Sequence, residues 1–184
     1  MLFISFFSII IKYLASYLKI NIMPNHLSTL GIIHTAISIL AILVALYALY
    51  KHGKINPASA PGKLYILLTA ITCITGFPIM RFGHPTPGHY LGIIILVLLA
   101  AGIYAKRVFG KAGEYIQVIL LSTTIFLSFI PAIVETSTRL PMDHPLAVGP
   151  NDPLVQKAQL VLVVIFLIGV IYQVIKLKKS RTAA

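Results

Sequence analysis

The sequence of 184 residues contains no tryptophan, one cysteine and four acidic residues. A single cysteine cannot form an intrachain disulfide or a cysteine-based metal site. Cys73 lies in an apolar run, which predicts a small buried hydrophobic side chain. Without tryptophan, an aromatic belt at a membrane surface has to be built from tyrosine. Charged residues make up 10% of the chain, against about a quarter in a typical soluble domain, which argues against a soluble protein.

The common catalytic signatures are also absent from the sequence. It has no phosphate-binding loop, no GxSxG or HExxH motif and no dinucleotide fingerprint, so an enzyme is not the expected class. The net charge of +11 could suggest a nucleic-acid-binding protein. However, the Lys and Arg residues are grouped at the ends of apolar runs, where they orient a protein in a membrane. We therefore expect the lipid bilayer as a partner, with other membrane subunits as a further candidate, and no nucleic acid.

Long apolar runs dominate what is present. The chain is 58% hydrophobic and its mean hydropathy is +0.94. Several of the runs are long enough to cross a hydrocarbon core of about 30 Å as helices. We predict an all-α integral membrane bundle that forms a single domain over residues 1–184, with a basic cytoplasmic tail at 178–184. The five predicted spans cover residues 27–50, 64–82, 89–105, 113–134 and 154–177.

Residues 2–20 are apolar but carry a polar stripe. The polar residues recur every three or four positions, which is typical of an amphipathic helix: Ser5, Ser8, Lys12, Ser16 and Lys19. If this helix crossed the membrane, Lys12 would lie near the middle of the bilayer at a cost of about 2.5–3.5 kcal/mol. We therefore expect the helix to lie along the outer interface, with a sixth span as the alternative.

The distribution of basic residues predicts the sidedness of the chain. Ten of the fifteen Lys and Arg residues flank the ends of the first, third and fifth spans, all on one side of the membrane. The positive-inside rule places that side, and the C-terminus, in the cytoplasm. These ten residues are Lys51, Lys54, Lys63, Lys106, Arg107, Lys111, Lys176, Lys178, Lys179 and Arg181.

The break RFGHPTPGH between the second and third spans holds Arg81, His84 and His89 and cannot lie in hydrocarbon. His34 lies seven residues, or about 10 Å, inside the first span. An ionisable residue at that depth is costly and is a functional candidate. We predict that its ring points into the bundle beneath the break. These four residues form a candidate ligand or proton site, for which a metal, a haem and a quinone headgroup are the ligands considered.

Weaker candidates lie on the same outer face, namely Glu135, Asp143 and His144. Histidine and carboxylate side chains together could bind copper or zinc, or could relay protons. The alternative is that they are ordinary loop and interface residues, since no close metal-ligand spacing such as HxxxH occurs. A haem held by His34 and His89 would need both ligands at one depth, and their positions in the spans differ.

The fourth span carries a polar seam. Glu114, Gln117, Thr124 and Ser128 recur at helical spacing and share one face, with Leu121 between them. Such a seam could guide ions or protons across the membrane. It could equally serve helix packing, because Ser and Thr allow helices to approach closely and form hydrogen bonds between them.

Three segments of the sequence resemble a known group of proteins: the span containing His34, the Gly62-x-x-Tyr65 segment and the span that begins at His89. Roughly residues 27–120 resemble uncharacterised bacterial multi-pass membrane proteins that share a domain of unknown function. That group tends to show a His-Arg pair before the loop glycine, where this chain has Ala60-Pro61. The resemblance implies a helical fold and the bacterial inner membrane, and it implies no activity.

Three functions remain open from the sequence. The first is a small inner-membrane protein with a ligand site at the outer histidines. The second is a non-catalytic accessory or structural subunit of a membrane complex. The third is a small solute or ion transporter that uses the polar seam.

Overall fold

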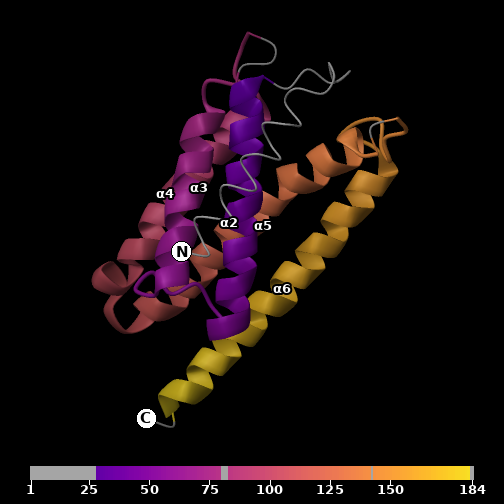
Figure 1. Cartoon of the computed structure of the whole chain (residues 1–184). Helices are drawn as coiled ribbons and strands as arrows, with labels where there is room; N and C mark the ends of the chain where they lie inside the picture. The colour runs from indigo at the N-terminus through magenta and orange to yellow at the C-terminus, as the bar shows by residue number, and fades with distance from the viewer. Residues whose placement is uncertain (1–27, 80–82, 142, 183–184) are drawn as a thin grey trace, which may run out of the picture.

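The computed structural model describes residues 28–79, 83–141 and 143–182 (Figure 1). Over these ranges the chain is helical and contains no strand, which confirms the all-α prediction. The predicted amphipathic helix at 2–20 lies outside the described residues, as does Arg81. The elements are α2 (Thr29–His52), α3 (Ala60–Gly76), α4 (Pro87–Phe109), the 3-10 turn η1 (Gly110–Ala112), α5 (Gly113–Arg139) and α6 (Pro153–Thr182).

Three helical segments of the described chain are long and apolar enough to cross a membrane: Thr29–His52, Pro87–Arg139 and Pro153–Thr182. The middle segment comprises α4, η1 and α5, and the chain reverses direction within it (Figure 1). The fourth apolar helix, α3, has 17 residues and a length of about 26 Å at 1.5 Å per residue. The structure thus establishes an apolar helical protein with three candidate membrane-crossing segments.

Helix α3 is shorter at its C-terminal end than the predicted span 64–82. It begins at Ala60, where the Ser59 hydroxyl accepts a hydrogen bond from the Gly62 amide at 3.2 Å, and it ends at Gly76. Pro78 has no N–H to continue the helical hydrogen-bond ladder. The Gly76 and Pro78 pair therefore terminates the helix. The helix therefore ends before the predicted span does, and residues 80–82 of that span lie outside the described part of the chain.

Two glycines allow the tight reversal between α4 and α5. Gly110 has a φ of 50°, a left-handed conformation that side chains with a Cβ rarely adopt. A Cβ at Gly113 would lie 2.5 Å from the Ala105 carbonyl oxygen, so only glycine fits against the preceding helix. Gly102 similarly allows Leu121 to pack against the α4 backbone, since a Cβ there would lie 2.8 Å from the Leu121 side chain. The two helices consequently pack closely along their length.

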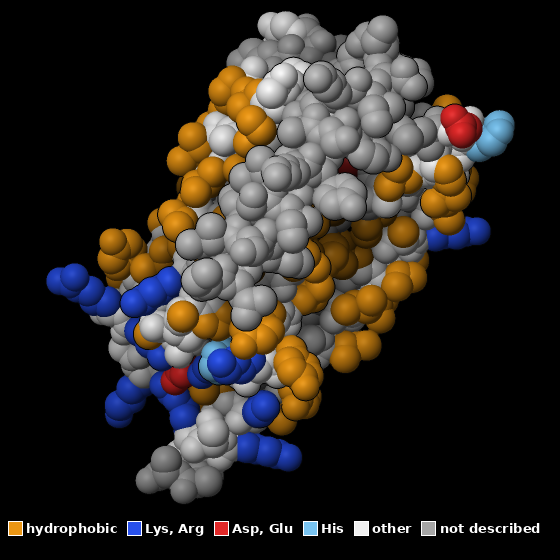
Figure 2. Space-filling model, in the orientation of Figure 1, with side chains coloured by type: hydrophobic (Ala, Val, Ile, Leu, Met, Phe, Trp, Pro, Cys, Tyr) orange, Lys and Arg blue, Asp and Glu red, His pale blue; other side chains and the backbone are white. Residues whose placement is uncertain are grey.

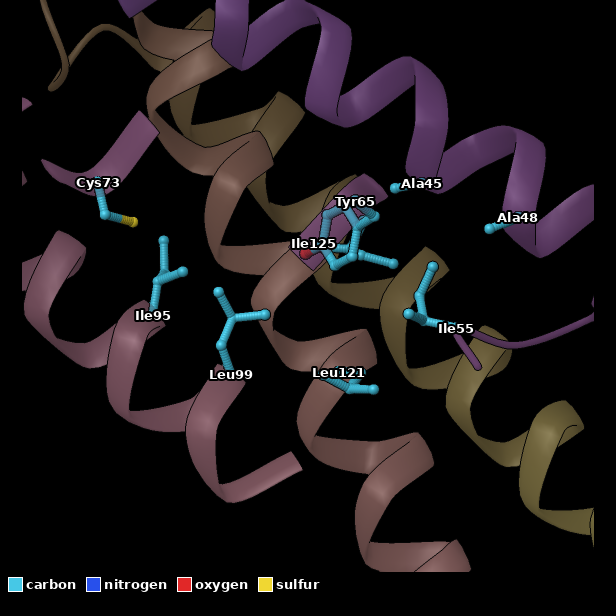
Figure 3. Close-up of a cluster of buried hydrophobic side chains, with 9 residues drawn as sticks. All are labelled: Ala45, Ala48, Ile55, Tyr65, Cys73, Ile95, Leu99, Leu121 and Ile125. Atoms are coloured by element: carbon cyan, nitrogen blue, oxygen red, sulfur yellow. The ribbon is translucent and has the colours of Figure 1, made fainter. Parts of the chain in front are cut away.

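The hydrophobic core lies between α2, α3, α4 and α5 (Figure 3). Small residues on α2 let this helix approach its neighbours, and Ala45 and Ala48 are completely buried. Cys73 is buried in the same core, as predicted for a small hydrophobic side chain. The full cluster is Ala45, Ala48, Ile55, Tyr65, Cys73, Ile95, Leu99, Leu121 and Ile125.

Helix α6 is inclined to the other helices and packs mainly on α5 (Figure 1). Within α6 only Val155 and Leu177, close to its two ends, are buried. Two contacts hold its central part: the rings of Phe126 and Phe166 stack at 4.6 Å, and Ser122 donates a hydrogen bond to Gln173 at 2.7 Å. The helix continues to Thr182, so most of the predicted basic tail 178–184 is helical.

Lys and Arg side chains gather around the end of the molecule where α6 finishes (Figure 2). The C-terminal ends of α2, α4 and α6 carry basic residues in their last turns, including Lys51, Lys106 and Arg181. The 3-10 turn before α5 adds Lys111 at the same end. The ten basic residues that the sequence assigns to one side therefore flank one end of the helices.

Candidate functional site

His34 lies on α2 and its ring faces the C-terminal end of α3, as predicted. The ring is half-buried, and its Nδ1 atom lies 3.3 Å from the Thr75 hydroxyl oxygen. Gly76 provides the space for the ring, because a Cβ at that position would lie 3.1 Å from the His34 Cε1 atom. The imidazole thus has a polar partner on a neighbouring helix rather than lipid alone.

The partners of Thr75 determine which His34 nitrogen donates. The Thr75 hydroxyl points back to its own helix, at 2.9 Å from the Ile71 carbonyl oxygen and 3.1 Å from that of Thr72. Its single hydrogen is therefore used, so the hydroxyl oxygen accepts from His34. In the neutral ring Nδ1 then carries the proton and Nε2 carries a lone pair. On this assignment Nε2 is the candidate ligand or proton acceptor, and the ring has a further hydrogen bond with the Thr72 backbone.

His89 joins the end of α3 to the start of α4. Its Nδ1 accepts a hydrogen bond from the Thr86 backbone amide at 3.0 Å, which requires Nε2 to carry the proton of the neutral ring. Nε2 then donates to the Phe77 carbonyl oxygen at 3.2 Å. This carbonyl lies at the C-terminal end of α3, where helical carbonyls have no partner within the helix. Both nitrogens of His89 are thus used in structural bonds, which leaves none for a metal or haem in this arrangement.

Of the other candidates of the break, the structure describes His84 alone. His84 is exposed, and its Nδ1 donates to the Pro85 carbonyl oxygen at 3.1 Å. Arg81 is not among the residues that the structure describes. Across the described ranges, no three His, Cys, Asp or Glu side chains come together as they would around a metal ion.

The weaker outer-face candidates are exposed. The Glu135 carboxylate accepts from the Arg139 guanidinium one helical turn along α5. Asp143 and His144 lie in the exposed loop between α5 and α6. These three candidates thus lie at exposed positions of the chain.

Asp152 in the same loop has a structural task. Its carboxylate oxygens accept hydrogen bonds from the backbone amides of Leu154, at 2.9 Å, and Val148, at 3.1 Å. These two bonds favour the charged form and hold the pKa of the Asp152 carboxyl below its usual value. The residue precedes Pro153, the first residue of α6, and acts as its N-terminal cap.

The polar seam of α5 is used in hydrogen bonds. Gln117 donates to the Gly102 carbonyl oxygen of α4 at 2.9 Å, and Ser128 donates to the Thr124 carbonyl oxygen at 2.8 Å. The Thr124 hydroxyl lies 2.8 Å from the Tyr65 hydroxyl of α3 and is completely buried. Leu121, also completely buried, separates Gln117 from Thr124. These bonds fit the helix-packing interpretation of the seam.

Glu114, at the start of α5, is the centre of an ion-pair cluster that the sequence analysis missed. Its carboxylate lies 2.7 Å from the Lys54 ammonium, 3.4 Å from that of Lys106 and 3.2 Å from the Arg181 guanidinium. Three separate parts of the chain therefore meet at one carboxylate. The signal was present in the sequence, because Glu114 is the one acidic residue among the basic residues of this side.

No known protein family, curated protein or solved structure matches this chain.

Proposed function

We propose that this chain is a non-catalytic accessory subunit of a membrane complex, embedded in the bacterial inner membrane. Its polar side chains form hydrogen bonds between its own helices. Its exposed apolar helices contact lipid and other membrane subunits. The proposal is supported by the hydrogen bonds that the buried polar groups make within the chain. His89 is used at both ring nitrogens, Gln117 bonds across to α4, and Thr124 bonds to α3.

The proposal includes five crossings of the membrane. Helices α4 and α5 have 23 and 27 residues and are joined by a tight turn, so each is long enough to cross alone. Helix α3 is shorter than the hydrocarbon core, and a short crossing is accommodated by local thinning of the bilayer. The apolar residues Phe77 and Ile79, which follow α3, extend its apolar length.

The proposed orientation places the C-terminus in the cytoplasm. The charge pattern supports it, because the basic residues gather at the end where α2, α4 and α6 finish. The exposed tyrosines Tyr47, Tyr50 and Tyr104 lie near this same end, where an aromatic belt is expected.

Native mass spectrometry of the chain released from membranes into a mild detergent tests the proposal. We expect a complex with a second membrane protein at a fixed ratio and no metal or chromophore at one per chain. A chain that is released without a protein partner, and that carries a stoichiometric metal or visible absorption band, would contradict the accessory role.

A second candidate function is a ligand site at His34, supported by the lone pair that the Thr75 contact assigns to Nε2. A metal, a haem or a quinone headgroup could use this atom. Comparison of the wild type with His34→Gln tests this candidate, because glutamine keeps a polar group and removes the imidazole. Loss of bound metal, of a visible band or of quinone binding in a variant that folds normally would support the ligand site. Unchanged ligand content would exclude it.

A further inference from the structure

The basic end of the molecule carries more positive charge than its acidic group balances. Glu114 pairs with Lys54, Lys106 and Arg181. Lys178 and Lys179, in the last turns of α6, have no acidic partner within the described ranges, and both are exposed. Two neighbouring ammonium groups without a counter-charge attract an anion.

The contacts of the neighbouring residues determine which way the two lysines face. Leu177 is buried, and Arg181 donates to Glu114 and to the Lys111 carbonyl oxygen, so these residues mark the side of α6 that faces the bundle. Lys178 and Lys179 project from other sides of the helix. With Ile175 and Thr182 they follow the spacing of three, four and seven residues that defines one helix face, and these four residues line an open depression.

An apolar stripe leads to this depression along α6. Ile168, Ile171 and Ile175 share the face of Lys178 and Lys179 by helical spacing. All three isoleucines are exposed, with between 50% and 63% of their surface accessible. In a membrane such a stripe contacts lipid acyl chains, and it ends at the two ammonium groups and the Thr182 hydroxyl.

We propose that this face of α6 binds an anionic phospholipid. Its phosphate lies between Lys178 and Lys179, and its acyl chains lie along Ile168, Ile171 and Ile175. Charge complementarity selects an anionic headgroup, and the adjoining apolar stripe selects a lipid over a free anion. Basic clusters next to the end of a membrane helix bind anionic lipids of the cytoplasmic leaflet in this way.

Titration of phosphatidylglycerol into the purified full-length chain in phosphatidylcholine nanodiscs, followed by native mass spectrometry, tests this proposal. We expect K178Q/K179Q to weaken the binding of phosphatidylglycerol about thirtyfold, from the usual contribution of each lysine near an anionic surface. K178R/K179R keeps both charges and should bind within about threefold of the wild type, because arginine also binds phosphate.

K51Q/K63Q is the matched control, since it removes two exposed lysines from the same end and leaves the α6 face intact. It should bind phosphatidylglycerol within about twofold of the wild type if a local site exists. An equal loss in K178Q/K179Q and K51Q/K63Q would show a general surface charge and overturn the site. Displacement of the lipid by millimolar inorganic phosphate would show a simple anion site and overturn the role of the apolar stripe. Unaltered binding in a folded K178Q/K179Q would refute the proposal.

Discussion

Removal of either partner of the Tyr65–Thr124 hydrogen bond should destabilise the bundle, and by unequal amounts. Tyr65 is 1% exposed, Thr124 is 0% exposed, and their hydroxyl oxygens lie 2.8 Å apart. The Thr124 hydroxyl donates to the Leu121 carbonyl oxygen at 2.8 Å, so Tyr65 must be the donor between the two. The two substitutions therefore leave different groups without a partner.

Tyr65→Phe removes the donor and leaves Thr124 with its own bond to Leu121. The expected loss is about 0.6 kcal/mol of unfolding free energy, the average for a hydrogen bond between membrane helices. Thr124→Val instead leaves the Tyr65 O–H buried without its acceptor, which costs about 1–3 kcal/mol. Thr69, one turn along α3, has a buried hydroxyl without a hydrogen-bond partner in the described structure and could accept instead. The Thr124→Val cost is therefore also measured in a Thr69→Val background, where it should be larger.

Reversible unfolding in mixed detergent micelles, followed by circular dichroism, measures these free energies. Tyr50→Phe is the control, because it makes the same chemical change at a side chain that is 91% exposed, and its effect should be within a few tenths of a kcal/mol of zero. A loss in Tyr65→Phe that equals or exceeds the loss in Thr124→Val would refute the assigned direction of the bond.

Three further predictions concern the loops and the orientation. His89→Ala should lower the unfolding free energy by about 1–3 kcal/mol, because it leaves the Phe77 carbonyl and the Thr86 amide without partners. His84→Ala, at an exposed position, should have a smaller effect. An equal loss of unfolding free energy in the two variants, measured in detergent, would contradict the role of His89 in joining α3 to α4. Asp152→Asn should be less stable than the wild type at pH 7. Because the pKa of Asp152 is lowered in the folded chain, this difference should shrink as the pH falls from the usual value of 3.8 through the lower pKa of the folded chain. A stability difference that does not shrink with falling pH would exclude the charged cap. A periplasm-active reporter fused after Ala184 should be silent, and strong reporter activity would reverse the proposed orientation.

The sequence was sufficient to predict the fold class, because the hydrophobicity of each run and the residues at its ends are local features that can be read directly. Long apolar runs predict helices, and the helix-capping serine Ser28 before α2 is visible in the sequence. The grouping of basic residues was equally visible, as was the depth of His34 in its run. The inward orientation of His34 followed from the cost of an unpaired imidazole in lipid, and its contact with Thr75 agrees with that reasoning.

The remaining features depend on which helices meet, and a single sequence does not show that. His89 was a reasonable ligand candidate until the Phe77 carbonyl was found against its Nε2 atom, twelve residues earlier in the chain. The cluster around Glu114 joins Lys54 and Arg181, which are far apart in sequence and approach only in the fold. The early end of α3 depended on whether Gly76 and Pro78 bend a helix or stop it, and both outcomes are common for such pairs.

The most direct test of the central claim is the mass of the intact assembly released from the native membrane, measured for the wild type and for His34→Gln. We expect both chains to carry the same membrane-protein partner at the same ratio, with no metal, haem or quinone at one per chain. A wild-type chain without a protein partner but with a stoichiometric ligand, absent from a folded His34→Gln, would contradict the accessory role and assign the function to the His34 site.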